Sequence, residues 1–154
     1  MNKIEYKLIT FLNLNPDQLY DIIKLRIEVF VVEQTCIYQD LDGKDKHGFH
    51  LLGYTQGEHP KLVSYARLLP QNVSYDHYVS IGRVIVDKSI RQSKEGYVLM
   101  KNAIKYCEEL WPLKSIKISA QAHLLKFYSN CGFVPVGDIY LEDDIPHIGM
   151  VLNK

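Results

Sequence analysis

The chain has 154 residues, 47% of them hydrophobic and 23% charged, and its 18 basic side chains balance its 18 acidic ones. This length and composition predict one globular domain, residues 1–154, that can bury its core without disulfides or a metal. The zero net charge argues against a nucleic acid or an anionic membrane as partner. No run of about 18 apolar residues is present, so no membrane span is predicted.

The cysteines and the N-terminus indicate a reducing, cytoplasmic setting. Cys36, Cys107 and Cys131 form an odd set without Cys-x-x-Cys spacing, which is typical neither of a disulfide framework nor of a zinc site. Residues 1–8 carry charges where a signal peptide needs an apolar run. Cys107 falls on the apolar stripe of a predicted helix, so we expect a core thiol.

The first helix has a clear start signal. Asn15 suits the N-cap and Pro16 the first helical position, and apolar residues follow at helical spacing to about Val31 or Val32. Further helices are predicted over residues 94–111 and 122–131, and strands over 3–11, 49–56, 61–69, 79–87, 115–119, 133–141 and 146–152. This order predicts a mixed central sheet with helices on both faces, of the α/β or α+β class.

Residues 35–48 are polar and resemble a calcium loop superficially. An EF-hand needs glycine at position six and glutamate at position twelve, but counting from Asp40 places Gly43 fourth and Leu51 twelfth. We therefore expect a solvated loop. Arg26 and Arg83 lie in otherwise apolar elements, where an arginine usually pairs with a carboxylate.

Residues 81–100 read as a β-branched strand, a polar turn and the first turn of a helix. Such a turn directs several N–H groups and the positive end of the helix dipole to one place, which favours a phosphate or pyrophosphate. Arg91 and Lys94 would add positive charge there. An ordinary strand-to-helix connection is the alternative for this segment taken alone.

Two motifs carry a resemblance to the GNAT-type N-acetyltransferases. The turn from Arg91 to Gly96 resembles the family's acyl-CoA motif, Arg/Gln-x-x-Gly-x-Gly/Ala, with Lys94 in place of the first glycine. Residues 127–133, Phe-Tyr-Ser-Asn-Cys-Gly-Phe, resemble its second signature. The ElaA-like subgroup is indicated by further blocks at residues 25–34, 40–43, 81–84, 120–123 and 142–147.

The resemblance implies a GNAT fold, with acetyl-CoA as cosubstrate and no metal. An exposed strand edge would hold the pantetheine by backbone hydrogen bonds, and the N–H groups of the turn would hold the pyrophosphate. Lys94 can still offer its N–H there if its backbone is helical. The implied cofactor-binding residues are Val84, Ile85, Val86, Arg91, Gln92, Ser93, Lys94, Glu95, Gly96, Tyr97 and Tyr128.

The same resemblance implies catalytic roles. Tyr128 matches the general acid that protonates the leaving thiolate, and packing on the cofactor or core is its alternative role. Glu33, Glu142 and His147 are candidates for the base that deprotonates the acceptor amine. An acidic mouth at residues 142–144 would attract a cationic amine, although a charged turn is often simply solvated.

The implied activity is direct acetyl transfer from acetyl-CoA to an amine of a small molecule or peptide. The alternative is a non-catalytic acyl-CoA-binding sensor or protein-interaction module. The identity of the acceptor, the choice of base and the oligomeric state stay open, a homodimer being one alternative.

Overall fold

The computed structural model describes residues 3–154, so Met1 and Asn2 of the charged N-terminal segment lie outside it. The strands are β1 (Ile4–Thr10), β2 (Phe49–Thr55), β3 (Leu62–Leu69), β4 (Val79–Val86), β5 (Ile116–Gln121), β6 (Val134–Glu142) and β7 (Ile145–Leu152). The helices are α1 (Pro16–Arg26), the π-helix η2 (Ile27–Glu33), α2 (Glu95–Leu110) and α3 (Leu125–Asn130). Short 3₁₀ turns are η1 (Phe11–Asn13), η3 (Lys44–His47), η4 (Lys88–Ser93) and η5 (Ala122–Leu124).

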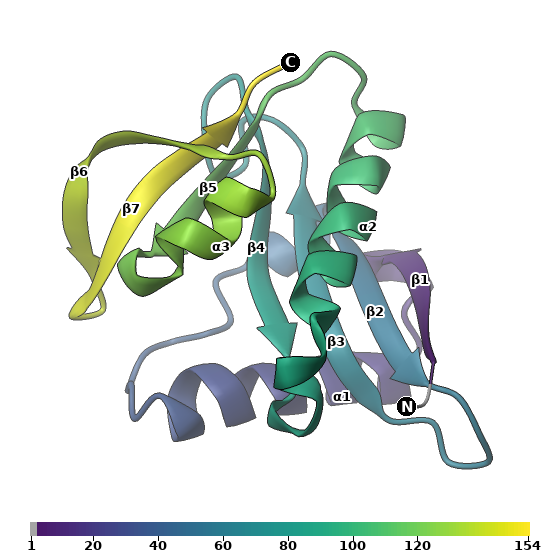
Figure 1. Ribbon diagram of the computed structural model, residues 1–154. Helices are drawn as coiled ribbons and strands as arrows, with labels where there is room; N and C mark the ends of the chain where they lie inside the picture. The colour runs from purple at the N-terminus through teal and green to yellow at the C-terminus, as the bar shows by residue number, and fades with distance from the viewer. Residues whose placement is uncertain (1–2) are drawn as a thin grey trace.

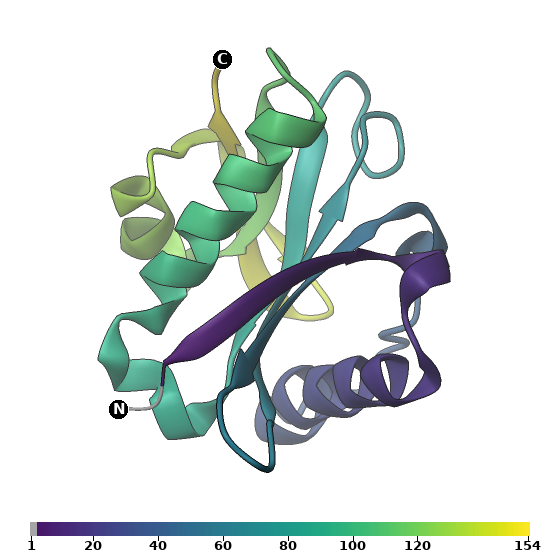
Figure 2. The same ribbon diagram turned by 90° about the vertical axis from the view of Figure 1, so that its right-hand side faces the viewer.

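The seven strands form one sheet in the order β1-β2-β3-β4-β5-β7-β6. Neighbouring strands are antiparallel except β4 and β5, which are parallel. Helix α1 covers one face of the sheet, and α2 and α3 cover the other (Figures 1 and 2). The predicted mixed sheet with helices on both faces is confirmed. No helix within residues 3–154 is both long and apolar enough to cross a membrane.

Each face of the sheet has its own core. On the α2 face, Leu99, Met100, Ala103 and Cys107 pack against strand residues including Ile81, as the helical spacing predicts. Burial raises the pKa of the Cys107 thiol to about 12, which fits the expected core thiol. On the other face, residues of α1, β2, β3 and β4 form a second cluster, namely Ile22, Leu25, Leu52, Leu62, Tyr65 and Ile85.

The first helix begins as predicted but ends differently. Asn15 and Gln18 form a reciprocal capping box, in which the Gln18 N–H donates to Asn15 Oδ1 at 2.8 Å. The α-helical pattern ends at Arg26, and a π-helix continues to Glu33, whereas the spacing predicted an α-helix to Val31 or Val32. The wider π-helical turns rotate the following side chains relative to an α-helix, and such segments are frequent at functional sites.

The loop over residues 35–48 is solvated over most of its length, as expected, but its Asp40 and Asp45 are buried in ion pairs with arginines. Arg26, which is 1% exposed, donates to Asp40 at 2.8 Å and to Asp45 at 2.6 Å. Arg83 also donates to Asp40, at 2.9 Å. The pairing predicted for both arginines is confirmed. Arg67 of β3 completes the network by donating to Asp42 and Asp45.

A buried histidine closes this network from the sheet side. His50 Nε2 lies 2.9 Å from the Asp45 carbonyl oxygen, and Nδ1 lies 2.7 Å from the Tyr65 hydroxyl. A carbonyl can only accept, so Nε2 carries the proton and Nδ1 accepts from Tyr65. The ring is therefore fully bonded in its neutral form. Burial lowers the pKa of His50.

Because the folded state lowers the pKa of His50, the unfolded chain takes up this proton first as the pH falls. The contribution of His50 to stability is therefore present above its unfolded pKa of about 6.5 and is lost below it, at up to about 1.4 kcal/mol per pH unit. We expect the free energy of unfolding in urea to fall between about pH 7.5 and about pH 5.5, and to fall less in His50→Gln. An equal pH dependence in the two proteins would contradict this account.

Candidate functional site

The site begins where β4 and β5 separate. The two parallel strands pair only at Val79 with Ile116 and at Ser80 with Lys117, and they then diverge (Figure 1). The backbone groups of β4 beyond Ser80 therefore face a gap on the β5 side. A cleft of about 770 Å³ occupies this region and is lined by both strands, η2, α3 and the β6–β7 hairpin.

A β-bulge shapes the β4 wall of the cleft. The pairing of β4 with β3 shifts register between Tyr65 and Arg67, opposite Arg83, whose φ is 49°. A non-glycine residue with positive φ has a strained backbone. A β-bulge also changes the direction of the residues that follow it in the strand. The bonds from Arg83 to Asp40 hold this conformation. The buried ion-pair network thus fixes the wall next to Val84.

The turn before α2 combines a strained lysine with a tightly packed glycine. Lys94 has φ 63° and ψ 15°, which is left-handed rather than helical, so the helical backbone that would offer its N–H to a phosphate is not present. This geometry explains why glycine suits the position. A Cβ on Gly96 would lie 3.2 Å from the Phe127 ring, so a larger residue there would require the ring to shift by a few tenths of an ångström.

Two predicted site residues bind each other. The Arg91 guanidinium donates two hydrogen bonds to the Glu33 carboxylate, one of them at 2.7 Å, and its Nε donates to the Val86 carbonyl oxygen at 2.9 Å. The Arg91 hydrogen bond lowers the pKa of Glu33. Glu33 is thereby a weaker base, and Arg91 is held at the cleft edge by a carboxylate instead of being free for a phosphate.

The remaining turn residues lie away from the cleft. Glu95 accepts a hydrogen bond from the Tyr6 hydroxyl at 2.7 Å. Tyr97 packs on Phe127, with ring centroids 4.8 Å apart. The predicted cofactor residues that line the cleft are Val84, Ile85, Val86, Arg91, Gly96 and Tyr128. Those that do not line it are Gln92, Ser93, Lys94, Glu95 and Tyr97.

Tyr128 lies on α3 at the cleft wall. The residue is 7% exposed, and its ring makes edge contacts with Phe127 and Phe133. Burial raises the pKa of the Tyr128 phenol, so the hydroxyl stays protonated and can donate. Among residues 3–154 no hydrogen-bond partner is found for this hydroxyl.

The β6–β7 hairpin brings His147 and Glu142 to the cleft, while Glu33 reaches it from η2. His147 Nδ1 lies 2.7 Å from the Ile145 carbonyl oxygen and must donate to it, because a carbonyl only accepts. In a neutral ring Nε2 then carries the lone pair, and it lies 3.3 Å from Glu142 Oε2. These two acceptors converge, so a donor such as an ammonium group would satisfy both.

The side chains that support the pair of His147 and Glu142 were not predicted from the sequence. The His147 ring stacks on Tyr140, and the Tyr140 hydroxyl hydrogen-bonds to Ser119 Oγ on β5. The pairing of β5 with β7 and of β6 with β7 brings these side chains together. No local motif contains this contact. The strand patterns of residues 115–119 and 146–152 predict two strands, but they do not predict the register in which the strands pair.

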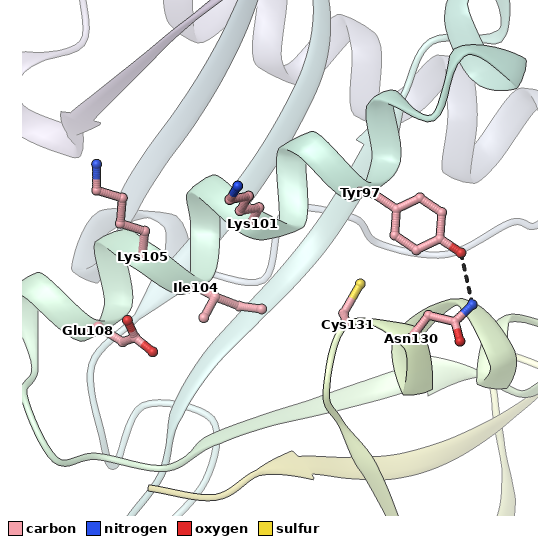
Figure 3. A pocket seen from close by; sticks show the side chains of 7 residues that line it. All are labelled: Tyr97, Lys101, Ile104, Lys105, Glu108, Asn130 and Cys131. Carbon is pink, nitrogen blue, oxygen red and sulfur yellow. Dashed lines mark hydrogen bonds between the residues drawn. The ribbon is translucent and has the colours of Figure 1, made fainter.

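A second cavity of about 460 Å³ lies between α2 and the end of α3. Figure 3 shows the Tyr97 hydroxyl bonded to Asn130, with the Cys131 sulfur and Ile104 facing the space between the helices. Lys101 and Lys105 also line this cavity. Tyr97 packs on Phe127, which lines the cleft, so the two cavities are neighbours.

Comparisons with known proteins agree with this geometry. A family model described as an acetyltransferase (GNAT) domain matches residues 17–154. Protein ElaA of Escherichia coli strain K12 is 46% identical over 149 residues, which are 96% of this chain and 95% of ElaA. The crystal structure of Escherichia coli ElaA has a TM-score of 0.89 at 43% identity, covering 97% of this chain and 99% of that one.

A crystal structure of an acyl-CoA N-acyltransferase from Pseudomonas aeruginosa has a TM-score of 0.88 at 42% identity, covering 97% of this chain and 99% of that one. The fold is thus that of an acyl-CoA-dependent acyltransferase. The chain belongs to the GNAT acetyltransferase family, and to its ElaA-like subgroup.

The left-handed backbone at Lys94 should make glycine more stable than lysine at this position. A left-handed conformation costs a residue with a Cβ about 1–2 kcal/mol, so we expect Lys94→Gly to raise the free energy of unfolding by about 1 kcal/mol. Lys94→Ala keeps the Cβ and serves as the control, with stability close to that of the parent protein. Urea unfolding measures both.

The same pair of variants tests whether the Lys94 side chain contacts the cofactor. The side chain is exposed and does not line the cleft, so we expect the Kd for CoA to change by less than about threefold in both variants. A common loss of about tenfold or more would instead place the ammonium group on a phosphate.

Proposed function

We propose that this protein transfers the acetyl group of acetyl-CoA directly to an amine of a small molecule or peptide. The observation that carries the proposal is the opening between β4 and β5. At one end of this opening lies the start of α2, which suits an anion. At the other end lie the hydrogen-bond acceptors His147 Nε2 and Glu142 Oε2. A thioester lying between them would meet Tyr128.

The cofactor site uses backbone more than side chains. The edge of β4 at Val84, Ile85 and Val86, where the Val86 carbonyl oxygen already accepts from Arg91 Nε, suits the amides of an extended pantetheine. The N–H groups at the start of α2 suit the pyrophosphate, with Gly96 leaving room for the approach. The second cavity would receive the nucleotide end, because Lys101 and Lys105 have no carboxylate partner among residues 3–154.

The chemistry follows from the groups on each side of the thioester. The acceptor ammonium loses a proton to His147, directly or through water, and its nitrogen attacks the acetyl carbonyl carbon. A β4 N–H near Val84 stabilises the oxygen as it becomes negative. The carbon–sulfur bond then breaks, and Tyr128 donates its proton or a hydrogen bond to the departing thiolate, while the nitrogen gives up its second proton to Tyr128 or to water. The products are the acetylated amine and CoA.

Burial changes how Tyr128 acts. The raised pKa of the phenol makes full proton transfer to a thiolate less favourable than between ordinary phenol and thiol groups. A hydrogen bond that strengthens as the sulfur becomes negative needs no complete transfer. The role we propose for Tyr128 is therefore a protonated donor positioned at the sulfur.

Among the three candidate bases, the geometry favours His147 with Glu142. Glu33 is held by Arg91, which lowers its pKa and occupies both its oxygens. The His147 side chain is 10% exposed and has a fixed tautomer, whereas the Glu142 side chain is 53% exposed. We assign proton removal to His147 and attraction of the cation to Glu142.

A thiol-release assay with acetyl-CoA and a panel of primary amines tests the activity and the role of Tyr128. We expect release of CoA with at least one amine, and a kcat about 10²-fold lower in Tyr128→Phe with an unchanged Kd for CoA. Tight CoA binding without turnover of any amine would favour the non-catalytic module. Unchanged turnover in Tyr128→Phe would remove its donor role.

A second comparison distinguishes the bases. We expect His147→Gln to lower kcat by about 10²-fold, because the group that removes the proton is gone. Glu33→Gln removes a partly exposed ion pair and should change kcat by less than about fivefold. If Glu33→Gln lowered kcat more than His147→Gln did, Glu33 would be the base.

A further inference from the structure

Gly82 of β4 has no structural requirement for glycine. Its φ is not in the left-handed range, and a Cβ built on it meets no heavy atom within 4 Å. Gly53 of β2 differs, because a Cβ there would come within 2.8 Å of Ser64 and Tyr6. Glycine inside a strand weakens it through its larger loss of conformational freedom. At Gly82 the missing side chain leaves open space in the cleft.

The sheet register places this space on the same face of the sheet as the proposed base, and both line the cleft. Ser80, two residues before Gly82, pairs with Lys117, two residues before Ser119. Residues two apart on a strand share a face, as do residues paired across strands. His147 pairs with the β5 residue two beyond Ser119. Gly82, Ser119 and His147 therefore lie on one face of the sheet.

We call this part of the cleft the acceptor compartment, bounded by Tyr75, Ser80, Gly82, Ser119, Glu142 and His147. Tyr75 supplies an aromatic wall. Burial, together with nearby Tyr140 and Glu142, raises the pKa of its phenol to about 12. The compartment thus has an open floor at Gly82, a neutral aromatic side and an acceptor pair for an ammonium group at one end.

The charges of the compartment disfavour a carboxylate on the acceptor. Arg67 and Arg83 at this end of the cleft are bound to Asp40, Asp42 and Asp45. Lys44 also lines the cleft and donates to Ser74 Oγ, while Asp143 adds a second carboxylate to that of Glu142 on the hairpin side. Glu142 on the hairpin would repel a second carboxylate. The acceptor body that fits is therefore uncharged apart from its amine.

We propose that Gly82 keeps the acceptor compartment deep enough for a primary amine carried on an uncharged, ring-sized carbon body, and so determines acceptor specificity. This inference rests on the proposed acetyltransferase function. A side chain at residue 82 would occupy the place of that body, while the β4 edge used by the pantetheine, after the bulge, would keep its backbone geometry.

The test compares amine size against side-chain size at residue 82. Ethylamine, phenethylamine and phenylalanine are assayed as acceptors with the parent protein, Gly82→Ala and Gly82→Leu. In the parent protein we expect kcat/KM for phenethylamine to exceed the values for both other amines by about tenfold or more. Gly82→Leu should lower kcat/KM for phenethylamine by about tenfold or more, with Gly82→Ala intermediate, and change ethylamine by less than about threefold.

The Kd for CoA and the thermal midpoint, measured on the same variants, separate a local block from a folding defect. Equal losses for ethylamine and phenethylamine, or no loss for phenethylamine, overturn the inference while leaving the acetyltransferase function intact. So does a parent protein that prefers phenylalanine or ethylamine. A parent protein that binds CoA but acetylates no amine overturns the proposed function, and the inference with it.

Discussion

The carboxylate of Asp40 receives hydrogen bonds from Arg26 of α1 and from Arg83 of β4. This contact joins three parts of the molecule: the helix on one face of the sheet, the loop over residues 35–48, and the bulged strand that forms a wall of the cleft. Removing one partner of a buried ion pair leaves an uncompensated charge, at a cost of about 3–5 kcal/mol. The strained conformation of Arg83 persists because Asp40 binds its guanidinium, and the position of the β4 edge depends on that conformation.

The opening between β4 and β5 is the second constraint. Strands in a sheet normally satisfy their backbone groups by pairing along their length, but these two do so at only two residue pairs. The end of η2 and the residue after it reach across the opening, since Glu33 binds Arg91 and Gln34 bonds to Gln121. The backbone groups of β4 that face the opening are thus available for a ligand. The same opening connects the turn before α2, which suits a phosphate, to His147 and Glu142, which suit a cation.

Local sequence signals predicted what depends on neighbours in the chain. The capping residues at Asn15 and Pro16, the apolar stripe of α2 and the strand–turn–helix order of residues 81–100 all follow from short-range spacing. The arginines in apolar elements correctly indicated ion pairs. The loop over residues 35–48 is largely exposed, as expected, but the burial of Asp40 and Asp45 was not predicted, because the partners of its carboxylates come from α1, β3 and β4. The contact of Glu33 with Arg91, and the stack of Tyr140 on His147, likewise depend on tertiary placement and strand register that spacing does not give.

We propose above all that the gap between β4 and β5 holds the reacting end of CoA. A crystal structure of the protein with CoA bound tests this most directly. We predict that the pantetheine lies along Val84, Ile85 and Val86, with its sulfur within hydrogen-bond reach of the Tyr128 hydroxyl. The other side of the sulfur should face open space that leads to His147. A CoA molecule bound outside the gap, or a sulfur remote from Tyr128, would contradict it.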